Sequence, residues 1–168
     1  MNIDFRFVRR SATGLLAGAG AALAFGSATG SAQAAQPLSG ELRSALSRGA
    51  PGAKVISPTV VEWPRQGVTL TLGRPSQTAP WMCDAQLVCL YQDANGRGRK
   101  IAFKKYGTYK LAAYGMGAGR KGVSSYYDNQ TGSAGSTLIG PGFRLPLRNF
   151  GNVPRSMNDR ATYIRLYE

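Results

Sequence analysis

The chain has 168 residues, of which 21 are Lys or Arg, eight are Asp or Glu and none is His. A chain without histidine has no Ser-His-Asp triad, no Cys-His dyad and no His-ligated zinc, and its two cysteines are too few for a zinc site made of cysteine alone. The acidic residues are scattered with no spacing that suggests a carboxylate pair, so we expect a binding protein rather than an enzyme.

Residues 1–34 show the three-part pattern of a cleavable secretory signal peptide. Three arginines lie in the first ten residues, residues 11–25 are uncharged and rich in Ala, Gly and Leu, and Ala32 and Ala34 form an A-x-A exit pattern. The apolar run is shorter than the ~20 residues that span a bilayer, which argues against a permanent membrane anchor. An adjacent pair of arginines leaves twin-arginine export open beside the general secretory route. We therefore expect a secreted, extracellular protein.

The expected mature chain, from Ala35, carries 18 basic and seven acidic residues, because the signal removes three basic residues and one acidic residue. Its net charge is therefore +11, compared with +13 for the whole chain. No second apolar run follows the signal, so we expect a soluble mature chain without a transmembrane segment. We also expect a monomer. Residues 35–168 suffice for one domain with its own core.

Residues 35–80 are predicted to form a helix, a β-hairpin and a linker. Leucines from Leu38 to Leu46 recur at the spacing of one helical face, with Ser39 as a candidate N-cap. Runs of β-branched residues predict short strands, and a Pro- and Gly-containing turn at residues 64–67 joins the last two into a hairpin. The strands are expected at residues 54–56, 59–63 and 68–72, and the linker at residues 74–80.

Residues 81–168 are predicted to form an all-β sandwich. Short aromatic and β-branched runs alternate with turns rich in Gly, Asn, Asp and Ser, which favours antiparallel strands over βαβ units. A weak internal repeat gives two halves, residues 87–128 and 135–168, which would bury their apolar faces against each other as Greek-key sheets do. Strands are expected at residues 87–91, 100–103, 123–127, 136–139, 143–147 and 161–167.

Cys83 and Cys89 are predicted to form a disulfide. Closely spaced cysteines in an exported protein are usually oxidised, and this spacing is not the C-x-x-C of redox motifs. The bond would close a short loop, for which we expect about 2–3 kcal/mol of stabilisation.

Residues 83–99, which read CDAQLVCLYQDANGRGR, resemble the opening of the streptomycete metalloproteinase-inhibitor family. Residues 111–116 and the serine pair at 124–125 resemble later landmarks of that family, and residues 41–72 resemble the leader segment of many members. The resemblance implies a βγ-crystallin-like Greek-key sandwich, preceded by the small helix-plus-hairpin segment. It also implies a peptidase inhibitor that occludes the cleft of an extracellular metalloprotease.

The resemblance does not place the inhibitory loop on this chain. Residues 74–81 and 106–120 are the exposed candidates. Either of them can equally be an ordinary connector.

Some proteins of the implied fold bind calcium through a loop of the pattern [N/D]-[N/D]-x-x-[S/T]-S in each half, because oxygen donors suit Ca²⁺. The second half offers Asn158, Asp159 and Thr162, with Tyr163 in place of the final serine. In the first half two basic residues replace the acid and amide, and their charge opposes a divalent cation. We expect no cofactor other than weakly bound calcium at the second loop, and a plain turn is the alternative there.

The stretch from Arg97 to Lys121 contains eight basic residues and no acid, with three tyrosines interleaved. Such a run favours an anionic partner, either an acidic protease surface or an anionic polymer or lipid of the cell envelope. Export argues against nucleic acid, and a generally basic exterior is the alternative. A cationic envelope-binding or antimicrobial role is therefore the rival to peptidase inhibition. The eight residues are Arg97, Arg99, Lys100, Lys104, Lys105, Lys110, Arg120 and Lys121.

Overall fold

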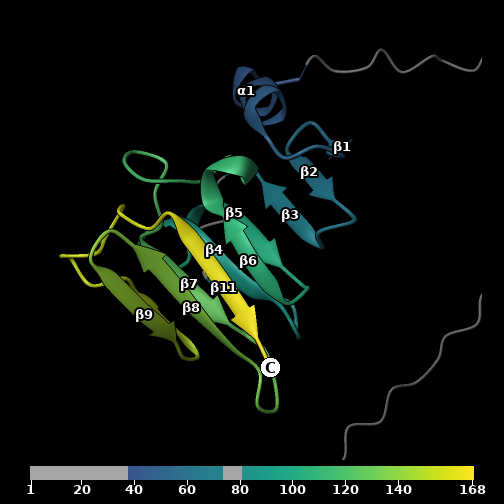
Figure 1. Cartoon of the computed structure of the whole chain (residues 1–168). Coiled ribbons are helices and arrows are strands. Elements are labelled where there is room, and N and C mark those ends of the chain that lie inside the picture. Colours follow the sequence, from purple (N-terminus) through teal and green to yellow (C-terminus); the bar gives the residue numbers. More distant parts are fainter. Residues whose placement is uncertain (1–37, 74–80) are drawn as a thin grey trace, which may run out of the picture. The chain divides into compact units, whose positions relative to one another are not determined.

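The computed structural model describes residues 38–73 and 81–168, which form one short α-helix, one 3-10 helix and eleven strands in two antiparallel sheets (Figure 1). The predicted all-β class is therefore confirmed. The predicted signal peptide at residues 1–34 and the linker at residues 74–80 lie outside the described residues. Within the described ranges, no helix is both long enough and apolar enough to cross a membrane.

The first element, α1 (Gly40–Arg48), forms where the leucine spacing predicts a helix. The Ser39 hydroxyl accepts a hydrogen bond from the Leu42 N–H at 3.2 Å, which confirms Ser39 as the N-cap. Leu42 and Ala45 are buried, so they fix one face of the helix to the core, and the helix ends at Arg48 with Gly49 as its C-cap.

Three strands follow the helix and form one end of the larger sheet: β1 (Lys54–Ser57), β2 (Val60–Trp63) and β3 (Val68–Thr71). β2 and β3 pair antiparallel across a tight turn, which confirms the predicted hairpin. β3 then pairs with β5 (Arg97–Phe103), where Leu70 lies opposite Ile101. The hairpin is thus continuous with the sheet that follows.

The segment after Trp81 contributes eight strands, six of which lie where the sequence predicts them, with ends that differ by a few residues. β6 and β10 were not expected. Besides β5, the strands are β4 (Val88–Asp93), β6 (Gly107–Lys110), β7 (Ser125–Asp128), β8 (Gly135–Gly140), β9 (Phe143–Leu147), β10 (Phe150–Asn152) and β11 (Tyr163–Tyr167), and the 3-10 helix η1 (Leu111–Tyr114) lies between β6 and β7.

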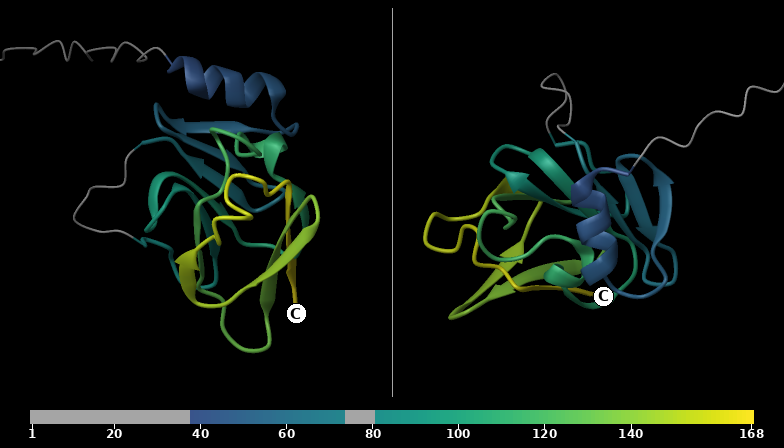
Figure 2. Two further views of the ribbon diagram at one scale, coloured as in Figure 1. Left: turned by 90° about the vertical axis from the view of Figure 1, so that its left-hand side faces the viewer. Right: turned by 90° about the horizontal axis from the view of Figure 1, so that it is seen from above.

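The strand order reveals two Greek-key halves that exchange one strand. The larger sheet has the order β1-β2-β3-β5-β4-β7-β10, and the smaller sheet has the order β6-β11-β8-β9. In each half the fourth strand pairs with the first, β7 with β4 and β11 with β8. The third strand of each half, β6 or β10, pairs in the opposite sheet. Figure 1 shows β6 beside β11, and Figure 2 gives two further views of the strands. This exchange favours the βγ-crystallin-like fold, which stays a prediction.

One core fills the space between the sheets and extends to α1. A smaller apolar cluster lies on the other face of the larger sheet, because alternate residues of a strand point to opposite faces. On β4, Val88 and Leu90 belong to the main core, whereas Cys89 and Tyr91 belong to the smaller cluster. The largest fully buried side chains of the main core include Trp63, Phe103, Leu42, Leu70, Ile101, Met116, Leu138 and Ile164.

Burial raises the pKa of Tyr91, Tyr109 and Tyr114 above the ordinary value of 10.0. The main cause is desolvation, which disfavours the charged phenolate. At Tyr91 the neighbouring Tyr127 and Asp84 raise the pKa further through their own negative charges.

The free energy of unfolding should therefore fall as the pH rises above about 10, where tyrosines of the unfolded chain ionise. The folded chain keeps these protons to higher pH than the unfolded chain does. Ionisation therefore favours the unfolded state above about pH 10, and the stabilising contribution of the three tyrosines is fully present below that pH. Urea unfolding at pH 8, 10 and 11 measures the decline. Replacing Tyr91 by Phe should lessen it, and an equally steep decline in Tyr91→Phe would contradict the contribution of Tyr91.

Candidate functional site

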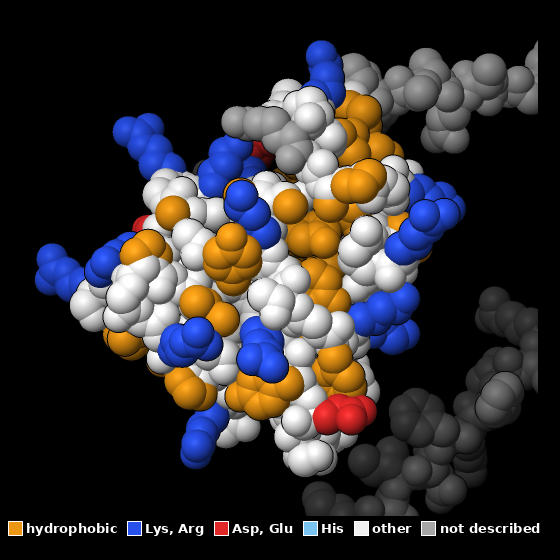
Figure 3. All heavy atoms as spheres, viewed as in Figure 1, with side chains coloured by type: hydrophobic (Ala, Val, Ile, Leu, Met, Phe, Trp, Pro, Cys, Tyr) orange, Lys and Arg blue, Asp and Glu red, His pale blue; other side chains and the backbone are white. Residues whose placement is uncertain are grey.

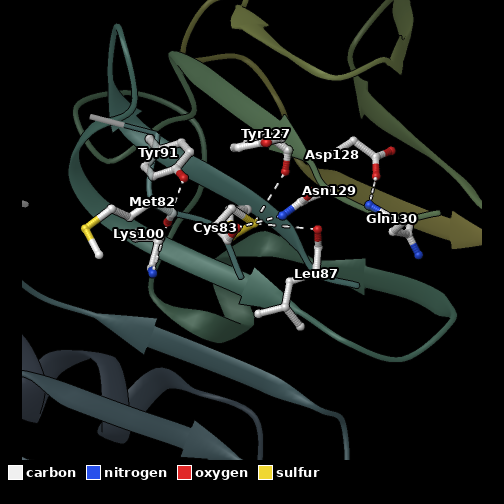
Figure 4. Close-up of a disulfide and its surroundings, with 10 residues drawn as sticks. Met82, Cys83, Leu87, Tyr91, Lys100, Tyr127, Asp128, Asn129 and Gln130 are labelled. Carbon is white, nitrogen blue, oxygen red and sulfur yellow. Dashed lines mark hydrogen bonds between the residues drawn. A yellow bond between two sulfur atoms is a disulfide. The ribbon is translucent and has the colours of Figure 1, made fainter. Parts of the chain in front are cut away.

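The disulfide between Cys83 and Cys89 joins residues 81–87 to β4 (Figure 4). Both cysteines are paired, so the predicted disulfide is confirmed. The 81–87 segment crosses the outer face of the larger sheet, where Trp81 and Leu87 pack against the small cluster formed by Cys89, Tyr91 and Ala102. The disulfide is thus part of the packing between this segment and the sheet.

Hydrogen bonds hold the backbone of the 81–87 segment in place. The Met82 carbonyl accepts one from the Tyr91 hydroxyl at 2.9 Å and another from the Lys100 ammonium group at 3.2 Å. The Asn129 side-chain amide donates to the Cys83 carbonyl at 2.8 Å. Figure 4 shows these donors converging on two successive carbonyl groups. The path of the chain beside the disulfide is therefore fixed from both sides.

Trp81 fixes the start of the segment. Its φ of 69° lies in a region that bulky residues rarely adopt. Its ring lies edge-on to Tyr91, with centroids 6.0 Å apart, and tilted against Phe150 at 5.2 Å. Gly96 allows this approach, since a Cβ there would lie 2.5 Å from the Trp81 nitrogen. A larger residue at position 96 would displace the Trp81 backbone.

The outward side of the segment is formed by Met82, Asp84, Ala85 and Gln86, all of which are exposed. The Gln86 side-chain amide donates to the Thr131 hydroxyl at 2.6 Å, which ties the end of the segment to the loop between β7 and β8. A segment whose backbone is already fixed loses little backbone freedom when it binds a partner, so mainly its exposed side chains have to be ordered. This geometry makes the segment the best candidate for a binding surface.

The two loops that sequence reasoning selected as inhibitory candidates do not include these residues. Residues 74–80 lie outside the described part of the chain. Residues 106–120 are mostly regular structure, namely β6 and η1, followed by a turn in which the Gly117 N–H donates to the Lys121 carbonyl at 2.9 Å. The exposed side chains of residues 82–86 were missed, although the adjacent disulfide was a signal that pointed to them.

The eight basic residues predicted as an anionic-partner patch are distributed over several surfaces. On the face shown in Figure 3, the Lys and Arg side chains are spread among apolar and uncharged groups rather than gathered in one cluster. The structure brings only three of the eight together in one groove. These three are Arg99, Lys110 and Lys121; Lys104 and Lys100 line two other hollows, and Arg97, Lys105 and Arg120 are exposed elsewhere among the described residues.

The groove that contains these three residues has a volume of about 410 Å³ and is lined by α1 and η1. Arg99 is only 6% exposed, donates to the Gly115 carbonyl at 2.5 Å and forms an ion pair with Glu41 at 3.1 Å. Arg99 is therefore a buried link between β5 and α1 rather than an exposed patch residue. Lys110 and Lys121 leave the groove with an excess of positive charge.

Replacing Arg99 by Ala should lower the free energy of unfolding by about 2–3 kcal/mol, because it removes a charged hydrogen bond and the packing of the side chain. Glu41→Gln should cost less than about 1 kcal/mol, since Glu41 is 60% exposed and water replaces its partner. Urea unfolding of both variants measures the difference. Equal losses in the two variants would contradict a structural role of Arg99 beyond the ion pair.

The residues of the predicted calcium loop lie where the two halves meet. The Asp159 carboxylate accepts hydrogen bonds from the Ser124 hydroxyl at 3.3 Å and from the Asn158 amide at 3.0 Å. The Thr162 hydroxyl donates to the Ile139 carbonyl at 3.3 Å. A Ca²⁺ ion bound through Asp159 would have to compete with these donors. Calcium binding stays a prediction, which titration calorimetry of the wild type and of Asp159→Ala tests.

The family comparison covers the part of the chain that carries the 81–87 segment and nearly all of both Greek-key halves. Residues 76–162, just over half of the chain, match the model of peptidase inhibitor family I36. No curated protein and no solved structure matches the chain significantly. The family match confirms the resemblance to streptomycete metalloproteinase inhibitors that residues 83–99 suggest. The chain therefore belongs to peptidase inhibitor family I36.

Proposed function

We propose that this protein is exported and inhibits an extracellular peptidase by occupying its substrate cleft. The observation that carries the proposal is the family match over residues 76–162. The signal-peptide pattern of residues 1–34 supports export. The absence of histidine from the chain supports a binding role rather than catalysis.

The described geometry supports inhibition by a rigid surface. An inhibitor must bind the cleft tightly without the loss of conformational freedom that a flexible peptide suffers, and a pre-organised segment reduces this cost. The 81–87 segment is fixed by a disulfide, by ring packing and by hydrogen bonds to two of its carbonyl groups. The sheet beneath it provides the support.

An inhibition panel tests the proposal. The mature, oxidised chain from Ala35 is titrated against thermolysin-like metallopeptidases and against serine, cysteine and aspartic peptidases. We expect stoichiometric inhibition of at least one metallopeptidase, with an affinity that persists when the salt concentration is raised. The proposal is wrong if no peptidase class is inhibited.

Envelope binding by the basic surface is the outcome that would replace inhibition. Binding to anionic cell-wall polymer or anionic vesicles that disappears between low and moderate salt would indicate an electrostatic partner. The wide distribution of the basic residues argues for weak, non-specific attraction of this kind rather than for one cationic site. Such binding in a chain that inhibits no peptidase would favour the envelope-binding role.

A further inference from the structure

The outer face of the smaller sheet carries aromatic and basic side chains in a regular arrangement. Along β11, Ile164 and Leu166 are buried in the core, whereas Tyr163, Arg165 and Tyr167 are exposed and point to the other side of the sheet. Figure 1 shows β11 between β6 and β8 within this sheet. This outer face belongs to a different sheet from the one on which the 81–87 segment packs.

The register of the strands places two cations in one row with Tyr163. Residues directly opposite each other on neighbouring antiparallel strands share a face of the sheet. Lys110 on β6 lies opposite Tyr163 on one side, and Ile139 on β8 lies opposite it on the other. Arg144 on β9 continues the row beyond Ile139. Lys110 and Arg144 are both exposed, so a positive charge lies on each side of Tyr163.

The next row along β11 is centred on Arg165. Thr108 on β6 and Thr137 on β8 lie opposite it, and their hydroxyl groups can donate or accept hydrogen bonds. Within the described part of the chain, Arg165, Lys110 and Arg144 form no ion pair with an acidic side chain. Figure 3 looks onto this sheet and shows Lys and Arg side chains between apolar ones, with few Asp or Glu side chains. The face therefore has positive charge that is not neutralised between its rings.

Tyr167 presents a fixed ring at the end of β11. Gly135 lies opposite it on β8, and a Cβ at Gly135 would lie 3.0 Å from the Tyr167 ring. The ring therefore rests on the backbone of β8, where a larger residue would collide with it. Its hydroxyl forms a hydrogen bond of 3.3 Å with the Thr137 hydroxyl. Tyr167 is nevertheless 38% exposed, so part of the ring is accessible to a partner that stacks on it.

The size of the face decides between a protein and a polymer as its partner. Three strand spacings of about 4.8 Å separate Lys110 from Arg144, and a rise of about 3.4 Å per residue separates Tyr163 from Tyr167 by about 14 Å. The face thus measures about 14 Å by 14 Å, or about 200 Å². A stable protein partner covers about 800 Å² on each side. A chain of rings laid along β11 requires no more than the area present.

We propose that the outer face of the smaller sheet, formed by Tyr163, Arg165 and Tyr167 with Lys110 and Arg144, binds an anionic polysaccharide. The C–H groups of sugar rings pack on the negative faces of the tyrosine rings, and the anionic groups of the polymer pair with the three cations. Unlike the non-specific attraction expected from the basic surface as a whole, this site requires rings as well as charge.

This binding goes beyond the proposed inhibition of a peptidase and does not depend on it. It retains an exported chain on an anionic cell envelope. The 81–87 segment packs on the other sheet, so it stays accessible in the retained protein. Single-stranded nucleic acid also offers rings and negative charge. The signal-peptide pattern of residues 1–34 favours a partner outside the cell, and therefore the polysaccharide.

Binding of the mature, oxidised chain to four polymers tests the proposal. Polygalacturonate has rings and charge, a neutral glucan has rings alone, polyphosphate has charge alone, and single-stranded DNA is the nucleic acid. We expect polygalacturonate to bind at low salt and to bind more tightly than the neutral glucan and the DNA. Its affinity should fall as the salt concentration rises, because ion pairs at an exposed face are screened. No binding of polygalacturonate, or tighter binding of DNA, would overturn the inference.

The variants separate stacking from charge. Tyr167→Ala should weaken polygalacturonate binding about tenfold, the effect of one lost stacking contact, and should leave polyphosphate binding unchanged. Tyr167→Phe keeps the ring and should stay within a few-fold of the wild type. Arg165→Gln should weaken polygalacturonate binding and reduce its salt dependence. Lys54→Gln is the matched control, because it removes the same charge from an exposed position on β1 in the other sheet.

Two patterns among the variants would overturn the inference. The first is equal loss in Arg165→Gln and Lys54→Gln with no loss in Tyr167→Ala, which indicates diffuse attraction. The second is loss of peptidase inhibition in Tyr167→Ala, which makes the face part of the peptidase contact. Equal thermal midpoints of Tyr167→Ala and the wild type show that folding is intact, and Arg165→Gln decides if the midpoint falls. A wild type that binds polygalacturonate but inhibits no peptidase overturns the proposed function alone.

Discussion

Replacing Trp63 by Ala is expected to lower the free energy of unfolding by about 3–5 kcal/mol, the range for a large aromatic side chain removed from a core. Trp63 is completely buried at the end of β2. Its ring lies edge-on to Tyr114, with centroids 5.1 Å apart, and its indole N–H donates to the Ala50 carbonyl at 2.8 Å. The variant loses the packing and leaves that carbonyl without its partner.

The effect is measured by urea unfolding, with Val55→Ala as the control. Val55 is an exposed residue on β1, and its replacement should change the free energy by no more than about 0.5 kcal/mol. Trp63 precedes the residues that match the family, whereas Tyr114 lies within them. A loss of less than about 1 kcal/mol for Trp63→Ala would contradict a core that Trp63 shares with the residues of the family match. Removal of a core side chain of this size lowers the free energy of unfolding by several times that amount.

Replacing both Cys83 and Cys89 by Ala is expected to lower the free energy of unfolding by about 2–3 kcal/mol. The bond closes a short loop, with a sequence separation of 6, and such a loop restricts the unfolded chain only moderately. The larger consequence concerns the 81–87 segment, which loses its covalent attachment to β4. We expect the amide hydrogens of residues 82–87 to exchange faster in the variant than in the wild type, since the whole segment gains conformational freedom.

A reducing agent provides the control for the cysteine variant. It should raise the exchange rates of residues 82–87 in the wild type to those of the variant and should leave the variant unchanged. Exchange rates that are insensitive both to reduction and to the double replacement would show that the hydrogen bonds from Tyr91 and Asn129 are enough to hold the segment.

Local sequence patterns predicted most of the elements but not the two strands that are exchanged between the sheets. β6 begins with Gly107 and carries a lysine, and β10 has only three residues, so neither shows the alternation that reveals a strand. Both strands depend on partners that lie far away in the sequence, β11 and β7. The helix and its Ser39 cap were predictable because their signals are local.

The same contrast between local signals and contacts of distant residues applies to the candidate site. The disulfide was predictable from spacing and export, but the pairing of Arg99 with Glu41 joins a strand to a distant helix, and no local pattern reveals it. Nor does a run of basic residues show which of them share a surface.

The exchange of β6 and β10 determines when, during folding, both sheets are complete and the chain can resist proteolysis. Neither half completes a sheet alone, since β6 pairs with β11 and β10 pairs with β7. Pairing between strands far apart in sequence is slow, because the loop between them must close before the contacts form. β11 is the last of the described strands in chain order, so the smaller sheet stays incomplete until β11 is available. Until that strand has docked, the chain is open to proteolysis, including by the peptidase that we propose it inhibits.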